Sequence, residues 1–307
     1  MKIGITTNMT WFGASITDTA KAAEALGYES LWMGEHIIIP VDVKNPFLYG
    51  VQLPPTYKHM PNPFIWLTAA AVVTSRLKFG MDVCLVPQRN PLILAKEVAC
   101  LDRISNGRLM FGVGAGWIEE EAGIMGYPFE KRWARTVDCV RALKTLWTEE
   151  TPSYTGEYVS FPPVYCYPKP LQQPHPPVLM GAGNPQTKAI HAVLKRTAEI
   201  ADGWVPSFFS PKEMAQHLKT LKELCGAKGR DFAKMEISLI VPGVTLGVSN
   251  EPVPWMRGMD ASSRNAAELI AQYEEAGVHR ILVGFPDLMP DTAVAVLEQA
   301  ARSLKLH

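Results

Sequence analysis

Strand-like and helix-like segments alternate along this sequence from its first residues to its last. Short apolar runs are each followed by a longer amphipathic segment. The apolar runs predict strands at 2–7, 30–33, 77–86, 108–114, 177–181, 203–206, 236–248 and 280–285. The amphipathic segments predict helices at 17–26, 63–75, 91–104, 131–147, 185–201, 211–225, 262–276 and 291–304. Because strands that alternate with helices form parallel sheets, only a few α/β folds are open to this chain.

The number of strands selects among those folds. Eight strand–helix units in 307 residues favour a closed (β/α)₈ TIM barrel. A doubly wound open sheet is the competing fold, but it has about six strands per sheet and a switch point between two halves. No change of composition divides this chain in two. We therefore predict a single TIM-barrel domain over residues 1–307.

Four connections are longer than the few residues that usually join a strand to a helix. Three follow predicted strands, at 37–62, 117–130 and 249–261, and the proline-rich segment 149–176 precedes the fifth strand. Barrel enzymes build their active sites from the loops that follow the strands. We therefore expect insertions at the C-terminal face of the barrel, as in an enzyme whose loops cover its site.

The composition excludes several classes of function. Lys plus Arg and Asp plus Glu each number 30, so the sequence offers no basic surface for nucleic acid. No stretch approaches the ~20 apolar residues of a membrane span. The five cysteines are far apart and show no pairing pattern, which is typical of free thiols in a reducing compartment. We expect a cytoplasmic protein that binds neither nucleic acid nor membrane.

Residues 108–121, RLMFGVGAGWIEEE, run from a predicted strand into closely spaced glycines. A dinucleotide-binding turn needs the spacing GxGxxG, whereas this stretch has GxGxG and Trp117 stands where the last glycine belongs. Two interpretations remain. Small residues can relieve crowding at the end of a barrel strand, or Gly114, Ala115 and Gly116 can let a flat ring approach the backbone.

A second group of small residues, MGAGNP at 180–185, lies where the fifth strand meets its helix. Backbone N–H groups of Gly181, Ala182 and Gly183 beside a helix N-terminus suit a phosphate or a carboxylate. A tight turn, with Asn184 as the N-cap and Pro185 as the first helical residue, explains the same sequence equally well.

The second predicted strand ends in Glu35 and His36. Most histidines in proteins are structural, but the C-terminal ends of barrel strands are where catalytic side chains come from. The chain has no HExxH motif and no Cys/His cluster, so we predict no metal site. It also has no GxSxG motif, which argues against covalent hydrolysis. Glu35 and His36 are therefore the candidate catalytic residues.

Three stretches together resemble the bacterial luciferase-like superfamily of flavin- and F420-dependent oxidoreductases. They are AKAAEALGYESLWMGEH at 20–36, SRLKFGMDVCLVPQRNPLILAKEVACLDRISNGRLMFGVGAGW at 75–117 and PPVLMGAGN at 176–184. The stretch 89–109 is the most specific of these matches. Within the superfamily, GVGAGWIEEE and the following GYPFEKRWART are most similar to the F420-dependent branch.

The resemblance implies a TIM barrel and assigns roles to particular residues. His36 corresponds to the active-site histidine of the superfamily, and a non-proline cis peptide at Asp82–Val83 is expected to bulge against the cofactor ring. The resemblance also places two backbone segments at the cofactor. The ring is expected along Gly114, Ala115 and Gly116, and the phosphate at Gly181, Ala182, Gly183 and Asn184.

The predicted function is hydride transfer between reduced F420 and a small, apolar organic substrate. His36 would move the accompanying proton, and Glu35 would orient it. The insertion 37–62, with Phe47, Tyr49 and Tyr57, would wall off the substrate. An FMN-dependent monooxygenase is the alternative, and a non-catalytic flavin-binding barrel is a second one. The resemblance also implies a flavin or F420 reductase as the electron source and a homodimer.

Overall fold

In the computed structural model of this protein, which describes residues 1–44, 53–248, 266–285 and 288–306, parallel strands close into a barrel. In spatial order the strands are β1 (Lys2–Thr7), β2 (Ser30–Met33), β3 (Lys78–Met81), β5 (Leu109–Gly114), β8 (Val178–Met180), β9 (Gly203–Trp204), β10 (Glu236–Pro242) and β11 (Arg280–Phe285). The ring closes because β1 pairs with β11 and β3 pairs with β5. The predicted TIM barrel is confirmed.

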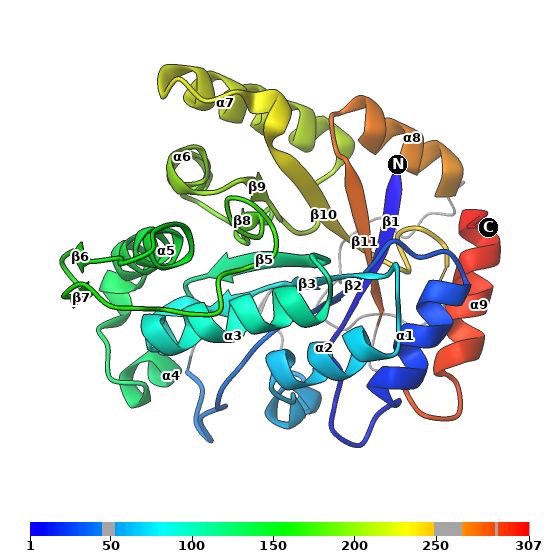
Figure 1. The fold of residues 1–307 in the computed structure, drawn as a ribbon. Coiled ribbons are helices and arrows are strands. Elements are labelled where there is room, and N and C mark those ends of the chain that lie inside the picture. Colours follow the sequence, from blue (N-terminus) through cyan, green and yellow to red (C-terminus); the bar gives the residue numbers. More distant parts are fainter. Residues whose placement is uncertain (45–52, 249–265, 286–287, 307) are drawn as a thin grey trace.

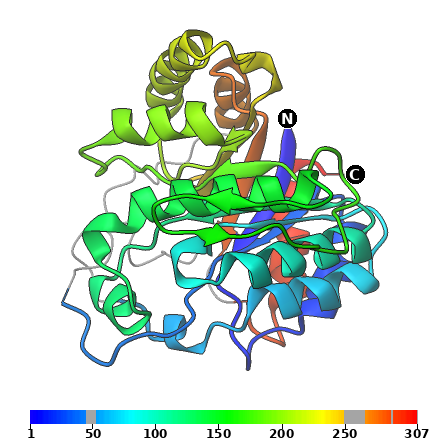
Figure 2. The same cartoon turned by 60° about the vertical axis from the view of Figure 1, so that its left-hand side comes forward.

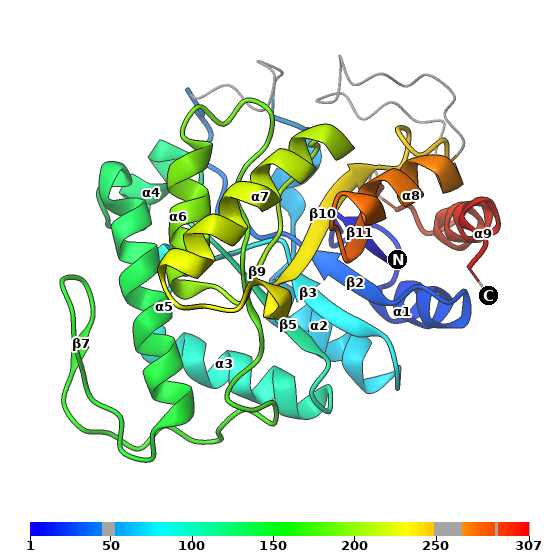
Figure 3. The same ribbon diagram turned by 90° about the horizontal axis from the view of Figure 1, so that it is seen from above.

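The long helices cover the outside of this barrel, as Figures 1 and 2 show from two sides and Figure 3 from above. They are α1 (Ile16–Ala25), α2 (Pro63–Val72), α3 (Pro91–Ile104), α5 (Arg132–Thr148), α6 (Ile190–Ile200), α7 (Pro211–Ala227), α8 (Ala266–Glu275) and α9 (Ala293–Leu304). Two smaller elements lie in the insertions: α4 (Glu119–Ile124) follows β5, and the hairpin of β6 (Tyr154–Thr155) and β7 (Ser160–Phe161) follows α5.

Several helices begin where the sequence predicts, because a capping residue precedes a proline. The side chains of Asn62, Asn90 and Ser210 accept hydrogen bonds from the first turns of α2, α3 and α7. The predicted start of α6 at residue 185 is wrong, since the helix begins at Ile190. Asn184 instead accepts a hydrogen bond from the Gln186 N–H in a local turn, which competes with the helix.

The predicted strand 236–248 is also too long, because β10 ends at Pro242 and turns follow. Pro242 is still in register with Gly284, and the Gly243 N–H donates to the carbonyl of Gly284, but the N–H groups of Thr245 and Leu246 then bond back to Pro242, so the chain turns away from the sheet. The predicted insertion 249–261 lies outside the described residues.

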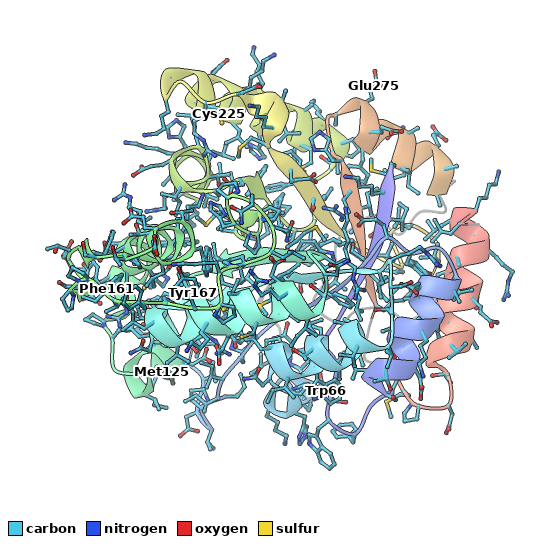
Figure 4. The ribbon with its side chains drawn as sticks, in the orientation of Figure 1. Trp66, Met125, Phe161, Tyr167, Cys225 and Glu275 are labelled. Atoms are coloured by element: carbon cyan, nitrogen blue, oxygen red, sulfur yellow. The ribbon has the colours of Figure 1, made fainter. Side chains whose placement is uncertain are left out.

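Side chains fill the barrel interior as well as the space between the strands and the helices, which Figure 4 draws. The interior cluster consists of Trp32, Met110, Leu179, Val205 and Leu282. Below it, the fully buried Arg280 donates hydrogen bonds to Glu29 and Ser238. The N-terminal end of the barrel is therefore filled, and the predicted site residues follow the strands at the opposite end.

The third strand bulges just below that opposite end. Phe79 and Gly80 of β3 pair with Leu109 and Met110, but the continuing strand β4 (Cys84–Leu85) pairs with Val113 and Gly114. Residues 81–83 thus face only 111 and 112 of β5, so the third strand carries one extra residue. The peptide bond between Asp82 and Val83, within this bulge, is cis, as the resemblance predicted.

A substitution at Gly112 tests how closely β3 and β5 approach each other at the bulge. A Cβ atom at Gly112 would lie 1.8 Å from the backbone oxygen of Met81, and backbone atoms cannot move away as a side chain can. We expect Gly112→Ala to lower the free energy of unfolding by about 3 kcal/mol. Gly226→Ala, in α7 with open space around the new methyl group, is the control and should be neutral or stabilising by up to ~1 kcal/mol. Urea denaturation measures both, and equal stabilities would contradict this packing.

Candidate active site

The predicted site residues lie on four strands that are neighbours in the barrel, β2, β3, β5 and β8. His36 follows β2, Asp82 and Val83 form the bulge after β3, Gly114 ends β5 and Gly181 follows β8. All of them are at the C-terminal ends of parallel strands, which meet at one mouth of the barrel. The structure therefore brings together residues that are nearly 150 positions apart in the sequence.

His36 is held by a carboxylate that the sequence analysis did not single out. Its Nδ1 lies 2.9 Å from Oε2 of Glu121 in α4, and both side chains are almost fully buried. The rings of Tyr57 and Trp117 lie 5.6 and 5.9 Å from the imidazole, measured between ring centroids. The signal for Glu121 was present in the acidic run at 119–121, but nothing in the sequence said which of the three glutamates turns inward.

Glu35 does not orient His36, contrary to the sequence-based prediction. Its carboxylate accepts hydrogen bonds from the Leu85 N–H at 2.9 Å and from the guanidinium of Arg89. Arg89 also pairs with Glu97 of α3 at 3.0 Å. Adjacent residues of an extended segment point to opposite sides, so Glu35 faces α3 while His36 faces α4. Glu35 thus anchors the segment that follows the bulge, and Glu121 is the orienting carboxylate.

α4 and the segment after His36 lie on the same side of the barrel mouth (Figures 1 and 2). The backbone N–H of Lys44 donates to Oε1 of Glu120 at 3.0 Å. This bond joins the insertion that follows β2 to the insertion that follows β5. The two insertions together therefore bury the His36–Glu121 pair.

The side chain of Val83 leaves room only for glycine at two of the predicted site positions. A Cβ atom at Gly114 would lie 2.3 Å from one methyl group of Val83, and one at Gly181 would lie 1.8 Å from the other. The first interpretation of Gly114, relief of crowding, is therefore supported, because the side chain of Val83 occupies the space beside this glycine. A contact between these backbone segments and a ring stays a prediction. Val83 is half-buried, and because its methyl groups reach Gly114 and Gly181 we call its exposed part the floor of the mouth.

The segment Gly181–Asn184 differs from the expected anion site in one respect. Asn184 is not the N-cap of α6, because the cap residue is Ala189. The N–H groups of Gly181 and Asn184 are already bonded to Val113 and to the hydroxyl of Thr187. In the part of the chain that the structure describes, this leaves the N–H groups of Ala182 and Gly183 without a partner. These two groups are what the segment offers to an anion.

Asp82 combines burial with an incomplete set of partners. Its Oδ2 accepts a hydrogen bond from the hydroxyl of Thr6 at the end of β1, while its buried Oδ1 has no partner among the described residues. Burial raises the pKa of the Asp82 carboxyl to about 7, although the bond from Thr6 acts to lower it. At neutral pH this carboxyl is therefore poised between its neutral and its charged form.

Comparison with known proteins identifies the family to which this chain belongs. A family model described as luciferase-like monooxygenase matches residues 13–251, which is most of the chain. The chain belongs to the luciferase-like monooxygenase family.

Relatives and solved structures agree with this assignment. A protein of Mycobacterium tuberculosis described as uncharacterised is 33% identical over 297 residues, 95% of this chain and 94% of that protein. The F420-dependent glucose-6-phosphate dehydrogenase of Kineococcus radiotolerans is 29% identical over 245 residues, 77% of this chain and 66% of that enzyme. The structure of an F420-dependent secondary alcohol dehydrogenase with an F420–acetone adduct covers 99% of this chain and 98% of its own, with 18% identity and a TM-score of 0.74. That likeness shows a shared fold.

In this luciferase-like protein, several buried polar atoms at the mouth lack a partner. Among the described residues they include Oδ1 of Asp82, Oε1 of Glu121 and the hydroxyls of Thr10 and Thr245. These residues follow β3, β5, β1 and β10, so they lie beyond the C-terminal ends of strands. Other unpartnered buried atoms lie elsewhere, for example the hydroxyl of Thr19 on α1. Buried polar atoms are normally paired, so those beyond the strand ends are compatible with a polar ligand there.

Two other kinds of site find no support in the described residues of this luciferase-like chain. No group of three or more histidine, cysteine, aspartate or glutamate side chains has the arrangement to hold a metal ion. None of the helices in the described ranges is long and apolar enough to cross a membrane.

The raised pKa of Asp82 predicts how stability changes with pH. In the folded chain this carboxyl keeps its proton up to about pH 7, whereas in the unfolded chain it has the ordinary aspartate pKa of 3.8. Holding this proton stabilises the folded state relative to the unfolded one. This stabilisation is complete below about pH 4 and is lost as the pH rises through about 7. We expect Asp82→Asn to be more stable than the wild type at about pH 8, by up to about 4 kcal/mol. The two should be similar at about pH 4, and urea denaturation across this range measures the difference.

Proposed function

We propose that this luciferase-like protein is an oxidoreductase that transfers a hydride between F420 and a small organic substrate, from reduced F420 to the substrate or from the substrate to oxidised F420. The observation that carries the proposal is the buried His36–Glu121 pair at a barrel mouth whose floor is the bulge at Val83. The 29% identical F420-dependent relative supports F420 over other ring cofactors. When bound, reduced F420 supplies the hydride from C5 of its ring.

The residues at the mouth fit such a cofactor. We assign the floor beneath the ring to Val83, with the backbone of Gly114, Ala115 and Gly116 along its edge. The phosphate is assigned to the backbone of Gly181–Asn184, where the N–H groups of Ala182 and Gly183 are available. The unpartnered buried hydroxyl of Thr245 supplies a further polar partner.

His36 is assigned the proton that accompanies the hydride. A carboxylate beside Nδ1 favours the tautomer in which Nδ1 carries the hydrogen and donates to Glu121. Nε2 is then the basic nitrogen, and it can accept a proton from a substrate hydroxyl or return one to a substrate carbonyl. Glu121 also stabilises the imidazolium that forms when Nε2 is protonated, as a buried carboxylate does for a catalytic histidine in other enzymes.

The surroundings of His36 favour an apolar substrate. The rings of Tyr57 and Trp117 lie beside the imidazole, so aromatic surfaces border the histidine. Such walls exclude water from a reacting centre and so protect the hydride donor. Phe47 and Tyr49, which the sequence also assigned to this wall, lie outside the described residues.

Two other functions remain as alternatives. An FMN-dependent monooxygenase would use the same ring floor and the same backbone N–H groups. A non-catalytic flavin-binding barrel needs no buried acid–base pair, so the His36–Glu121 contact disfavours it. We also propose a cytoplasmic location, from the scattered cysteines of the sequence, and a homodimer and an F420 or flavin reductase as the electron source, from the family resemblance.

The choice of cofactor is tested by binding. We expect the purified protein to change the fluorescence of F420 on titration and to bind FMN more weakly, because the F420-dependent relative is similar over most of this chain. Anaerobic mixing with reduced F420 and a panel of ketones and aldehydes then tests for oxidation of the cofactor. Tight FMN binding without F420 affinity would instead favour the monooxygenase.

The roles of His36 and Glu121 are tested by substitution. We expect His36→Ala to lower turnover by about 10²–10⁴-fold, the usual contribution of a positioned acid–base group, with cofactor affinity retained. Glu121→Gln keeps the size of the side chain but cannot stabilise the imidazolium, so turnover should fall while the protein stays folded. The matched control is His191→Ala, at an exposed position of α6. Full turnover in His36→Ala would remove the histidine from this role.

A further inference from the structure

We propose that the side chain of Asp82 is a direct partner of the bound cofactor ring, with Oδ1 hydrogen-bonded to the polar edge of the heterocycle. This inference rests on the proposed function, because it needs a flat ring on the floor formed by Val83. It goes further by assigning a specific side chain, beyond the backbone of the bulge, to ring recognition.

The first argument comes from the direction of the side chains in the third strand. A Cβ atom at Gly80 would lie within 2.4 Å of the Trp32 ring, which belongs to the interior cluster, so position 80 faces the barrel interior. Asp82, two residues further along, faces the same way. Val83 also faces inward, because its methyl groups occupy the Cβ positions of Gly114 and Gly181. The bulge therefore directs two consecutive side chains into the barrel mouth, where a regular strand would direct one.

The second argument comes from the partners of the carboxyl group. Thr6, at the inner face of β1, donates to Oδ2 and thereby fixes the orientation of the group. Oδ1 is then left buried and unpartnered among the described residues. An unsatisfied buried oxygen costs roughly 1–3 kcal/mol, so a ligand that completes its hydrogen bonding regains that free energy on binding.

Neighbouring charged groups do not compete for this oxygen. On the adjacent elements, His36 and Glu121 pair with each other and Glu35 pairs with Arg89. The thiol of Cys84, on the same strand, is fully buried, and its pKa is raised well above the ordinary value by burial and by Glu35. None of these groups forms a hydrogen bond with Asp82 in the described part of the chain.

The protonation of Asp82 couples to cofactor binding. In the neutral carboxyl, with Oδ2 accepting from Thr6, Oδ1 carries the hydrogen and donates it to an acceptor on the ring. The raised pKa of about 7 keeps much of this form at neutral pH. Ionisation converts the donor into a negative charge beside a phosphate-bearing anionic cofactor. Affinity should therefore fall as the pH rises through about 7.

The test is a fluorescence titration of F420 and of FMN at about pH 6 and about pH 8. For the wild type we expect affinity to fall between the two pH values by roughly threefold to tenfold. Asp82→Asn keeps a donor but cannot ionise, so its affinity should not show this decrease. The ligand's own titration is the same for both proteins and cancels in their comparison. Asp82→Leu removes the donor, and its affinity should be reduced at both pH values.

Two threonine variants provide a matched pair. Thr6→Val removes the hydroxyl that orients Asp82 and should weaken cofactor binding. Thr19→Val removes a hydroxyl that is equally buried and unpartnered but lies on α1, and it should have no effect. If Asp82→Leu does not fold, the pH profile of Asp82→Asn and the threonine pair still decide the question.

The outcomes separate this inference from the proposed function. Failure of the wild type to bind either cofactor at any pH would overturn both. Tight cofactor binding that is unchanged in Asp82→Leu, with the same pH dependence in Asp82→Asn as in the wild type, would overturn this inference alone. In that case Asp82 serves only to tie β3 to β1.

Discussion

The packing of Val83 between β5 and β8 is the interaction on which the rest of the site depends. The bulge at residues 81–83 turns Val83 inward, and only glycine at 114 and 181 leaves room for its methyl groups. The same bulge turns Asp82 toward Thr6 and directs the chain into the segment that Glu35 and Arg89 hold. One extra residue in one strand thus determines the floor of the mouth and one of its polar groups.

The buried carboxyl groups around the mouth are differentiated by their partners. Glu35 pairs with a guanidinium and has a structural role, whereas Glu121 pairs with the imidazole to which we assign the proton of the proposed reaction. Asp82 accepts a hydrogen bond from the Thr6 hydroxyl, but its burial still disfavours the charged form. The environment of each group, and not its residue type, sets what it can do in catalysis or binding.

Local sequence signals predicted much of the fold. Asparagine or serine before proline marked the starts of α2, α3 and α7, because these caps act within one helical turn. The same signal failed at Asn184, where hydrogen bonds with Gln186 and Thr187 close a turn and delay α6 to Ile190. A cap and a turn use the same side chain, and the sequence alone does not separate them.

The sequence by itself determined the alternation of strands and helices, the barrel it implies, and His36 as a residue at the mouth. The family resemblance placed the cis bond at Asp82–Val83. Only the tertiary structure decided that Glu121 orients His36 and that Glu35 turns away to Arg89. The physical reason is distance along the chain: His36 and Glu121 are 85 residues apart, and their contact exists only because the barrel brings the insertions after β2 and β5 together.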